Sequence, residues 1–333
     1  MRAVLPLAGV SDFFDAVDQF FAELAGVKWG ALAVALLFFT AYLSLRARAS
    51  FNILRAAYPT EAFRYKDIWA AYFAGYGFNS VIPARGGDVI RLFLTKTSVP
   101  RSSYPAIASS FFVENVFDLT MAVFILTFAF TQGVFPKPPD FANLGAFDLS
   151  YFAQHPKFAL FTITALGVLS LAAVAIMSAR VRAFWERVKQ GLTILYDRHR
   201  YLRQVWLIQF AGWLCRFTAF WFLLEAFHIG GSVKNVLLVL GVNAVAAAVP
   251  FTPGGAGVQQ ALLVKVFDGN AHVAAYSVGQ QIAIAAWTFG VGFLAIAIVF
   301  RMRSFKEVMR RGREDRARDK QMRAESEASE APA

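Results

Sequence analysis

The chain has 333 residues, of which 57% are hydrophobic, 16% are aromatic and only 17% are charged. Soluble domains carry roughly 25% charged residues, so this composition excludes an ordinary soluble domain and predicts an all-α, polytopic helical membrane protein. The formal net charge of +11 is explained by basic loops on the cytoplasmic side of a plasma membrane, and no nucleic-acid partner is expected.

The chain divides into three parts by composition. Residues 29–300 are predicted to form the transmembrane domain, and residues 301–333 a charged cytoplasmic tail that is partly disordered. Residues 1–28 form an acidic amphipathic segment that is expected to lie at the outer membrane interface. Its apolar residues recur at helical spacing, at Phe13, Phe14, Val17, Phe20, Phe21 and Leu24.

Apolar stretches and basic segments together predict the topology. Five stretches are long enough to cross a bilayer as helices, namely 29–45, 104–132, 158–178, 206–227 and 273–300. The net basic segments, which are expected on the cytoplasmic side, are 46–67, 84–103, 180–204 and 301–333. Five crossings place the N-terminus outside and the C-terminus in the cytoplasm.

Two further apolar segments are interrupted by glycine and proline. The first, 68–83, ends at Pro83, and the second, 233–267, is broken between Pro250 and Gly257. If each formed one crossing, basic segments would lie on both sides of the membrane, whereas two re-entrant hairpins entering from opposite faces remove the conflict. Opposed broken segments are typical of transporter sites near the membrane midplane. The alternative is two short spans with one violation of the positive-inside rule.

The first break is followed by a candidate phosphate site. Arg85 and Arg91 flank Gly86, Gly87 and Asp88. Guanidinium groups bind phosphate bidentately, and glycine lets backbone N–H groups approach the same anion. The alternative is a cytoplasmic loop with ordinary arginines and an Arg85–Asp88 ion pair.

Four charged residues fall inside predicted spans, where charge is expensive; they are Glu114, Asp118, Arg216 and, near the end of its span, Glu225. Glu114 and Asp118 are four residues apart and so share one helix face, which fits either an ion-paired structural cluster or coupling to a proton or cation. Arg216 lies near the middle of 206–227, where it costs at least ~3 kcal/mol unless paired. It is expected to meet a phosphate headgroup or to be neutralised by Glu114, Asp118 or Glu225.

The second break is predicted to form the other half of the site. Its residues are Pro253, Gly254, Gly255, Gly257 and Gln260, and a helix that starts after Gly257 would point its positive end at the break. Neutral polar residues nearby would either tie helices together or line a path for a headgroup; they are Asn243, Gln259, Gln280 and Gln281.

Three of these motifs resemble one family. The sequence PGGAGVQQ at 253–260 is similar to the PGGxGxxE element of the lysylphosphatidylglycerol synthase transmembrane-region family, which is flippase-like. Residues 85–91 resemble its R-x-G-[DE]-x-x-R element, and residues 114–118 its E-R-x-x-D element. Asn115 stands where arginine is usual and Gln260 where glutamate is usual, so roles that need charge at these two positions are not carried over.

The resemblance implies binding and translocation of anionic or polyprenyl-phosphate-linked membrane lipids. Nothing after residue 300 resembles the soluble aminoacyl transferase of the best-known members, so lysyl transfer is not expected, and no enzyme activity, cofactor or metal site is predicted. The alternative is a non-transporting membrane partner of a lipid-modifying or glycosyl-transferring enzyme. A third interpretation is an integral membrane transferase that acts on lipid phosphates.

Overall fold

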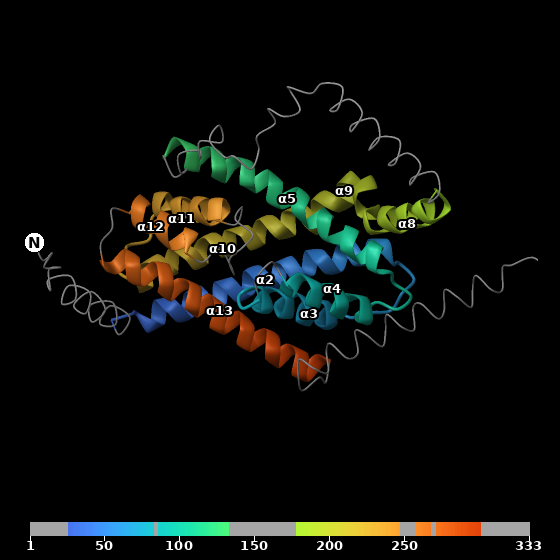
Figure 1. Cartoon of the computed structure of the whole chain (residues 1–333), viewed down its shortest axis with the longest axis horizontal. Helices are drawn as coiled ribbons and strands as arrows, with labels where there is room; N and C mark the ends of the chain where they lie inside the picture. The colour runs from blue at the N-terminus through green and yellow to red at the C-terminus, as the bar shows by residue number, and fades with distance from the viewer. Residues whose placement is uncertain (1–25, 83–85, 133–177, 247–256, 268–270, 301–333) are drawn as a thin grey trace, which may run out of the picture.

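The structure, a computed structural model, describes residues 26–82, 86–132, 178–246, 257–267 and 271–300, and all regular elements in these ranges are helices (Figure 1). The prediction of an all-α, polytopic helical membrane protein is therefore confirmed. The predicted N-terminal segment, the span at 158–178 and the tail after residue 300 fall outside the described residues, apart from residues 26–28 and Ser178.

Four helical stretches are long and apolar enough to cross a membrane. They are α2 (Trp29–Ala57), α5 (Tyr104–Thr131), the continuous stretch Arg198–Ala226 and α13 (Ala271–Val299). The third contains α9 (Arg198–Tyr201), a π-helical stretch (Leu202–Trp206) and α10 (Leu207–Ala226). These correspond to four of the five predicted spans.

Helices α2 and α10 form an antiparallel pair through the centre of the fold. The backbone N–H of Lys28, before α2, donates to the carbonyl of Ala226 at the end of α10 (3.0 Å). Near the middle, Gly212 lies so close to α2 that an added Cβ would be 3.4 Å from the Tyr42 carbonyl oxygen. At the other end, the Asn52 amide donates to the Gln204 carbonyl (2.8 Å). These three contacts fix the register of the pair.

Helix α2 is longer than the sequence predicted. The expected span stops at residue 45, before the first arginine, but the helix continues to Ala57 and buries Arg46. A helix stop inferred from the first charge was wrong here because that charge has partners inside the protein.

The first broken segment forms a helical hairpin. Helices α3 (Tyr65–Asn79) and α4 (Gly86–Ser98) lie side by side, and a Cβ on Gly87 would overlap the Gly75 carbonyl oxygen and lie 2.6 Å from the Asn79 nitrogen. Glycine is needed at this position because the two backbones touch. The described part of the basic segment 84–103 is thus mostly helix packed on α3 and differs from the loop of the alternative interpretation.

The ends of this hairpin lie together at one end of α2. The Ser103 backbone N–H, just before α5, donates to the Tyr58 hydroxyl, just after α2 (3.3 Å). At the same place the Gln190 side chain of α8 (Ser178–Gly191) donates to the Ala57 carbonyl (3.1 Å). Parts of three basic segments, 46–67, 84–103 and 180–204, therefore gather at one end of the bundle.

The second broken segment begins at the opposite end. Helix α11 (Val233–Ala246) follows the end of α10, and α12 (Val258–Val266) packs against both α11 and α13. The residues between them, which include Pro253, Gly254 and Gly255, lie outside the described residues.

The two hairpins reach the middle of α13 from opposite ends. An added Cβ on Gly77, in the last turn of α3, would lie 2.5 Å from the Thr288 carbonyl oxygen. In the first turn of α12, the Gln260 amide donates to the Gln281 side chain. Positions 281 and 288 are separated by roughly 10 Å along a helix. Helix α3, with 15 residues, is about 22 Å long, which is shorter than a hydrocarbon core of about 30 Å.

Close packing of α3 on α13 gives a prediction about two neighbouring glycines. An added Cβ on Gly292 would lie 2.8 Å from the Phe73 carbonyl oxygen, whereas one on Gly290 would have no atom within 4 Å. We expect Gly292→Ala to destabilise the fold by about 1–3 kcal/mol, because backbone atoms must move apart. Gly290→Ala is the control and should be neutral or slightly stabilising. Thermal unfolding of the two variants in detergent checks this, and equal melting temperatures would contradict the packing.

Candidate functional site

Four helices meet at a cluster of charged side chains. Glu114 and Asp118 project from one face of α5, as predicted, toward Arg46 of α2 and Arg91 of α4. The Arg46 guanidinium donates to both Asp118 carboxylate oxygens (2.5 and 2.7 Å) and lies 3.7 Å from Glu114. The Arg91 guanidinium pairs with the other oxygen of Glu114 and donates to the Ser50 hydroxyl (3.0 Å). We call Arg46, Arg91, Glu114 and Asp118 the charged cluster.

Aromatic rings hold both arginines in place. The Arg91 guanidinium lies 4.0 Å from the ring centroid of Tyr72 and 4.0 Å from that of Phe111, so it is sandwiched between α3 and α5. The Arg46 Nε donates to the Tyr72 hydroxyl (2.7 Å). Stacking on aromatic faces stabilises a guanidinium that has lost its water.

Burial is uneven across the charged cluster. Glu114 is 2% exposed and Arg46 9%, while the Asp118 side chain is 44% exposed. Buried charges are tolerated because each carboxylate has an arginine partner. Glu114 and Asp118 therefore belong to an ion-paired cluster, in which the Asp118 side chain is the exposed member.

Arg216 has a different environment. Its guanidinium lies 5.7 Å from the ring centroids of both Tyr42 and Phe220, and no carboxylate of the described residues is within ion-pair distance, 4.0 Å, of it. The Glu225 carboxylate, which lies nine residues further along the sequence, accepts from the Gly231 N–H (2.7 Å).

Arg216 and the charged cluster are linked through one ring. The Arg46 guanidinium lies 6.0 Å from the same Tyr42 ring, and Tyr42 is near the middle of the 29-residue helix α2. Together these helices bring three arginines near two carboxylates, which leaves one positive charge in excess. An uncompensated cation in a membrane interior attracts an anion.

The other predicted residues lie in two places. Gly86, Gly87 and Asp88 form the first turn of α4, and the Asp88 carboxylate accepts from the Asn79 amide (2.8 Å). Arg85 lies outside the described residues. Gly257 has a φ of +86°, and its N–H donates to the Gln260 side chain (2.5 Å). The contacts of Gln260 thus fasten α12 to α13, while the charged cluster lies among α2, α3, α4 and α5.

The sequence analysis did not identify four polar residues of α2, α3 and α10 as candidates for this site. Arg46 was assigned to a cytoplasmic segment, and Ser50, Tyr72 and Gln209 carried no signal of their own. The spacing of Tyr42, Arg46 and Ser50 could have indicated that Arg46 faces the protein interior, because the three residues share one helix face if the first span continues past residue 45. Gln209 is 1% exposed, and neither polar atom of its amide has a hydrogen-bond partner among the described residues.

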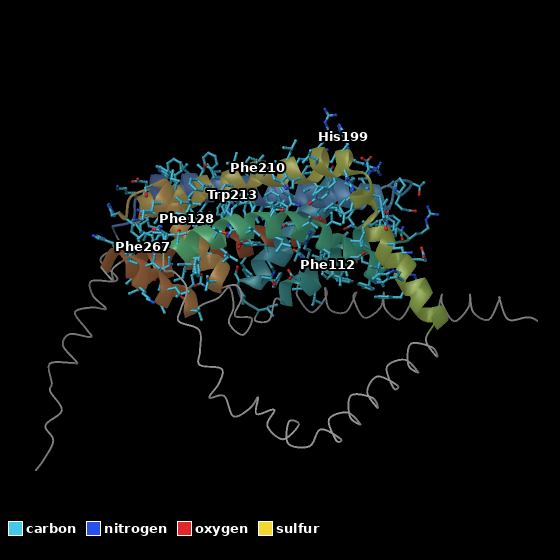
Figure 2. The ribbon with its side chains drawn as sticks, turned by 90° about the horizontal axis from the view of Figure 1, so that it is seen from above. Phe112, Phe128, His199, Phe210, Trp213 and Phe267 are labelled. Carbon is cyan, nitrogen blue, oxygen red and sulfur yellow. The ribbon has the colours of Figure 1, made fainter. Side chains whose placement is uncertain are left out.

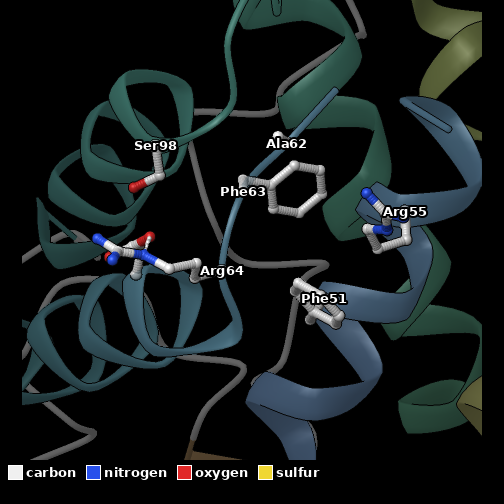
Figure 3. A pocket seen from close by; sticks show the side chains of 7 residues that line it. Phe51, Arg55, Ala62, Phe63, Arg64 and Ser98 are labelled. Atoms are coloured by element: carbon white, nitrogen blue, oxygen red, sulfur yellow. Dashed lines mark hydrogen bonds and ion pairs between the residues drawn. The ribbon is translucent and has the colours of Figure 1, made fainter. Parts of the chain in front are cut away.

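Two features of the surface accompany the site. Aromatic side chains follow one another from the end of the π-helical stretch along α10, with stacked or tilted rings 5.4–6.4 Å apart; they are Trp206, Phe210, Trp213, Phe217 and Trp221. Figure 2 labels Phe210 and Trp213. At the basic end of α2, an open depression is lined by Phe51, Arg55, Phe63 and Arg64 (Figure 3). Within the described ranges no group of three His, Cys, Asp or Glu side chains is placed to hold a metal ion.

The fold and the charged cluster define a polytopic helical membrane protein with arginine and carboxylate groups inside its helix bundle. The chain belongs to the family described as lysylphosphatidylglycerol synthase TM region, whose model matches residues 7–279. The matched range includes both broken segments and all the cluster residues. No curated protein and no solved structure matches the chain.

The charged cluster makes a prediction about stability. Glu114→Gln should lower the stability of the fold by about 3–5 kcal/mol, because it leaves Arg91 buried without its carboxylate. Adding Arg91→Met should recover part of the loss, since both buried charges are then gone. The exposed pair Glu186–Lys189 supplies the control, and Glu186→Gln should change stability by less than about 1 kcal/mol. Thermal unfolding in detergent distinguishes these cases, and a double variant no more stable than Glu114→Gln would contradict the pairing.

Proposed function

We propose that this protein binds anionic or polyprenyl-phosphate-linked lipids in the plasma membrane and moves their headgroups across it. The family to which the chain belongs links it to the handling of membrane lipids. The proposal assigns no chemical reaction to the chain. Its topology has the N-terminus outside and the C-terminus in the cytoplasm, in accord with the basic segments at one end of the bundle.

The unbalanced arginine is the observation that carries the proposal. Arg216 costs at least ~3 kcal/mol at the middle of a membrane unless an anion accompanies it, and the carboxylates of the charged cluster are taken by Arg46 and Arg91. A lipid phosphate is the anion that a membrane supplies. The guanidinium can bind two of its oxygens at once.

The opposed hairpins supply a route for the headgroup. In the proposal, α3 and α4 enter from the cytoplasm, α11 and α12 enter from outside, and both close on α13. The acyl or polyprenyl tail stays in the bilayer beside α10. A shallow groove on that helix supports this, because its lining of Phe217, Thr218, Trp221 and Phe222 is mainly apolar.

The role of Arg216 gives a transport prediction. In liposomes that contain the purified protein, Arg216→Gln should slow the transfer of fluorescent phosphatidylglycerol between leaflets by about tenfold or more, which corresponds to about 1.4 kcal/mol. Transfer of phosphatidylcholine, which has no net charge, tests specificity. Arg64→Gln is the control, because the Arg64 side chain is 72% exposed and pairs with Asp67 at the surface.

Three results bear on the alternatives. If the wild-type protein moves neither phosphatidylglycerol nor a polyprenyl phosphate, the transport proposal is wrong. The non-transporting partner of a lipid-modifying or glycosyl-transferring enzyme is then favoured, and it is tested by removing residues 304–333. If Arg216→Gln transports like the wild type, the role of Arg216 is wrong.

The re-entrant hairpin gives a topological prediction. In a Cys215→Ser background, Ala62→Cys marks the exposed linker between α2 and α3, and Ser80→Cys marks the end of α3. An impermeant thiol reagent should modify both from the cytoplasmic side, because the tip of the hairpin does not cross the membrane. Modification of Ser80→Cys from the opposite side to Ala62→Cys would show that α3 crosses fully.

A further inference from the structure

The exposed side of the charged cluster has the geometry of an occupied anion site. Asp118 accepts both N–H groups of the Arg46 fork, the arrangement that guanidinium also makes with phosphate. Of the two carboxylates, Asp118 is the accessible one, since its side chain is 44% exposed and that of Glu114 only 3%. The accessible partner of a buried arginine is the partner that an incoming anion can replace.

Arg46 keeps other contacts when Asp118 is removed. Its Nε donates to the Tyr72 hydroxyl at 2.7 Å, and its guanidinium is 3.7 Å from Glu114. The Tyr72 contact holds the side chain in place. The Nη1 and Nη2 atoms lose Asp118, and Nη2 keeps only its longer contact with Glu114, so both nitrogens can donate to new oxygen partners. Loss of Asp118 therefore makes guanidinium N–H groups available to a new acceptor, while the Arg46 side chain keeps its position.

A second polar group lies at the same level of the bundle. Gly212 packs against Tyr42, and the Asn52 amide binds the Gln204 carbonyl. Because α2 and α10 are antiparallel, Gln209 falls between these contacts and comes beside the turn of α2 that carries Arg46. Its amide is buried and has no hydrogen-bond partner among the described residues. An unsatisfied buried donor is unfavourable until an acceptor reaches it.

We propose that Arg46 and Gln209 form a second binding station for a lipid phosphate, and that Asp118 is the internal anion that occupies it when no lipid is bound. The inference rests on the proposed function and adds to it a displaceable carboxylate. The Arg216 and Arg46 guanidinium groups lie 5.7 and 6.0 Å from the centroid of the same Tyr42 ring, so a phosphate that leaves one arginine can pass along this ring to the other.

The test is a binding measurement on the full chain in phosphatidylcholine nanodiscs, with phosphatidic acid as the lipid probe and inorganic phosphate as the free one. Asp118→Asn should bind phosphatidic acid about tenfold more tightly, because a charged competitor is gone. Adding Arg46→Gln should abolish the gain. Glu225→Gln is the matched control, because its carboxylate accepts from a backbone N–H at the other end of α10, and it should bind like the wild type.

Gln209→Leu tests the same station without removing a charge. Leucine has a similar volume and removes an amide that has no partner, so the melting temperature should not fall. Affinity for phosphatidic acid should fall about fivefold, as for the loss of one hydrogen bond. Gln209→Leu tests the proposal even if Asp118→Asn does not fold. If Gln209→Leu binds phosphatidic acid as tightly as the wild type, the proposed station is wrong.

The remaining outcomes are separable from the transport proposal. Tighter binding by Asp118→Asn in a protein that moves no lipid supports the station and contradicts transport. If the protein transports lipid but Asp118→Asn binds phosphatidic acid no more tightly than the wild type, only the station is wrong. The same conclusion follows if the tighter binding persists after Arg46→Gln is added. A gain for inorganic phosphate without one for phosphatidic acid overturns the assignment to a lipid.

Discussion

The arrangement of the first half of the bundle depends on keeping Arg46, Arg91, Glu114 and Asp118 paired away from water. A buried charge without a partner costs several kcal/mol, and this cost forces α2, α4 and α5 to present the right side chains at one level. Glu114 lies between both arginines and so joins three helices through one carboxylate. Tyr72 adds α3, because its ring stacks on Arg91 and its hydroxyl binds Arg46.

Backbone contact at glycine makes this arrangement possible. Gly75 and Gly87 let α3 and α4 touch, which brings Arg91 toward α5, and Gly77 and Gly292 let α3 lie against the middle of α13. Larger side chains at these positions would separate the helices and lengthen the ion pairs. The glycines that interrupt the apolar pattern are therefore packing sites within the helices of this hairpin.

The second hairpin is held by neutral groups. Gln260 binds the Gly257 N–H and the Gln281 side chain. Here a neutral amide fastens α12 to α13 without a buried charge. The described charges near the middle of the bundle are thus concentrated in the charged cluster and Arg216, which is why the proposed binding of phosphate is assigned to α2 and α10.

The sequence by itself determined the all-α class, four of the described spans, the Gly/Pro-broken segments and the shared face of Glu114 and Asp118. These features follow from local composition and helical period, which a single segment carries. The tertiary structure alone decided that Arg46 is a buried partner of Asp118, 72 residues away, that 86–98 is a helix packed on α3, and that the buried amide of Gln209 lies without a partner among the described residues on the helix that pairs with α2. The physical reason is that a charge near the end of an apolar stretch looks the same in sequence whether it meets water or a carboxylate from another helix.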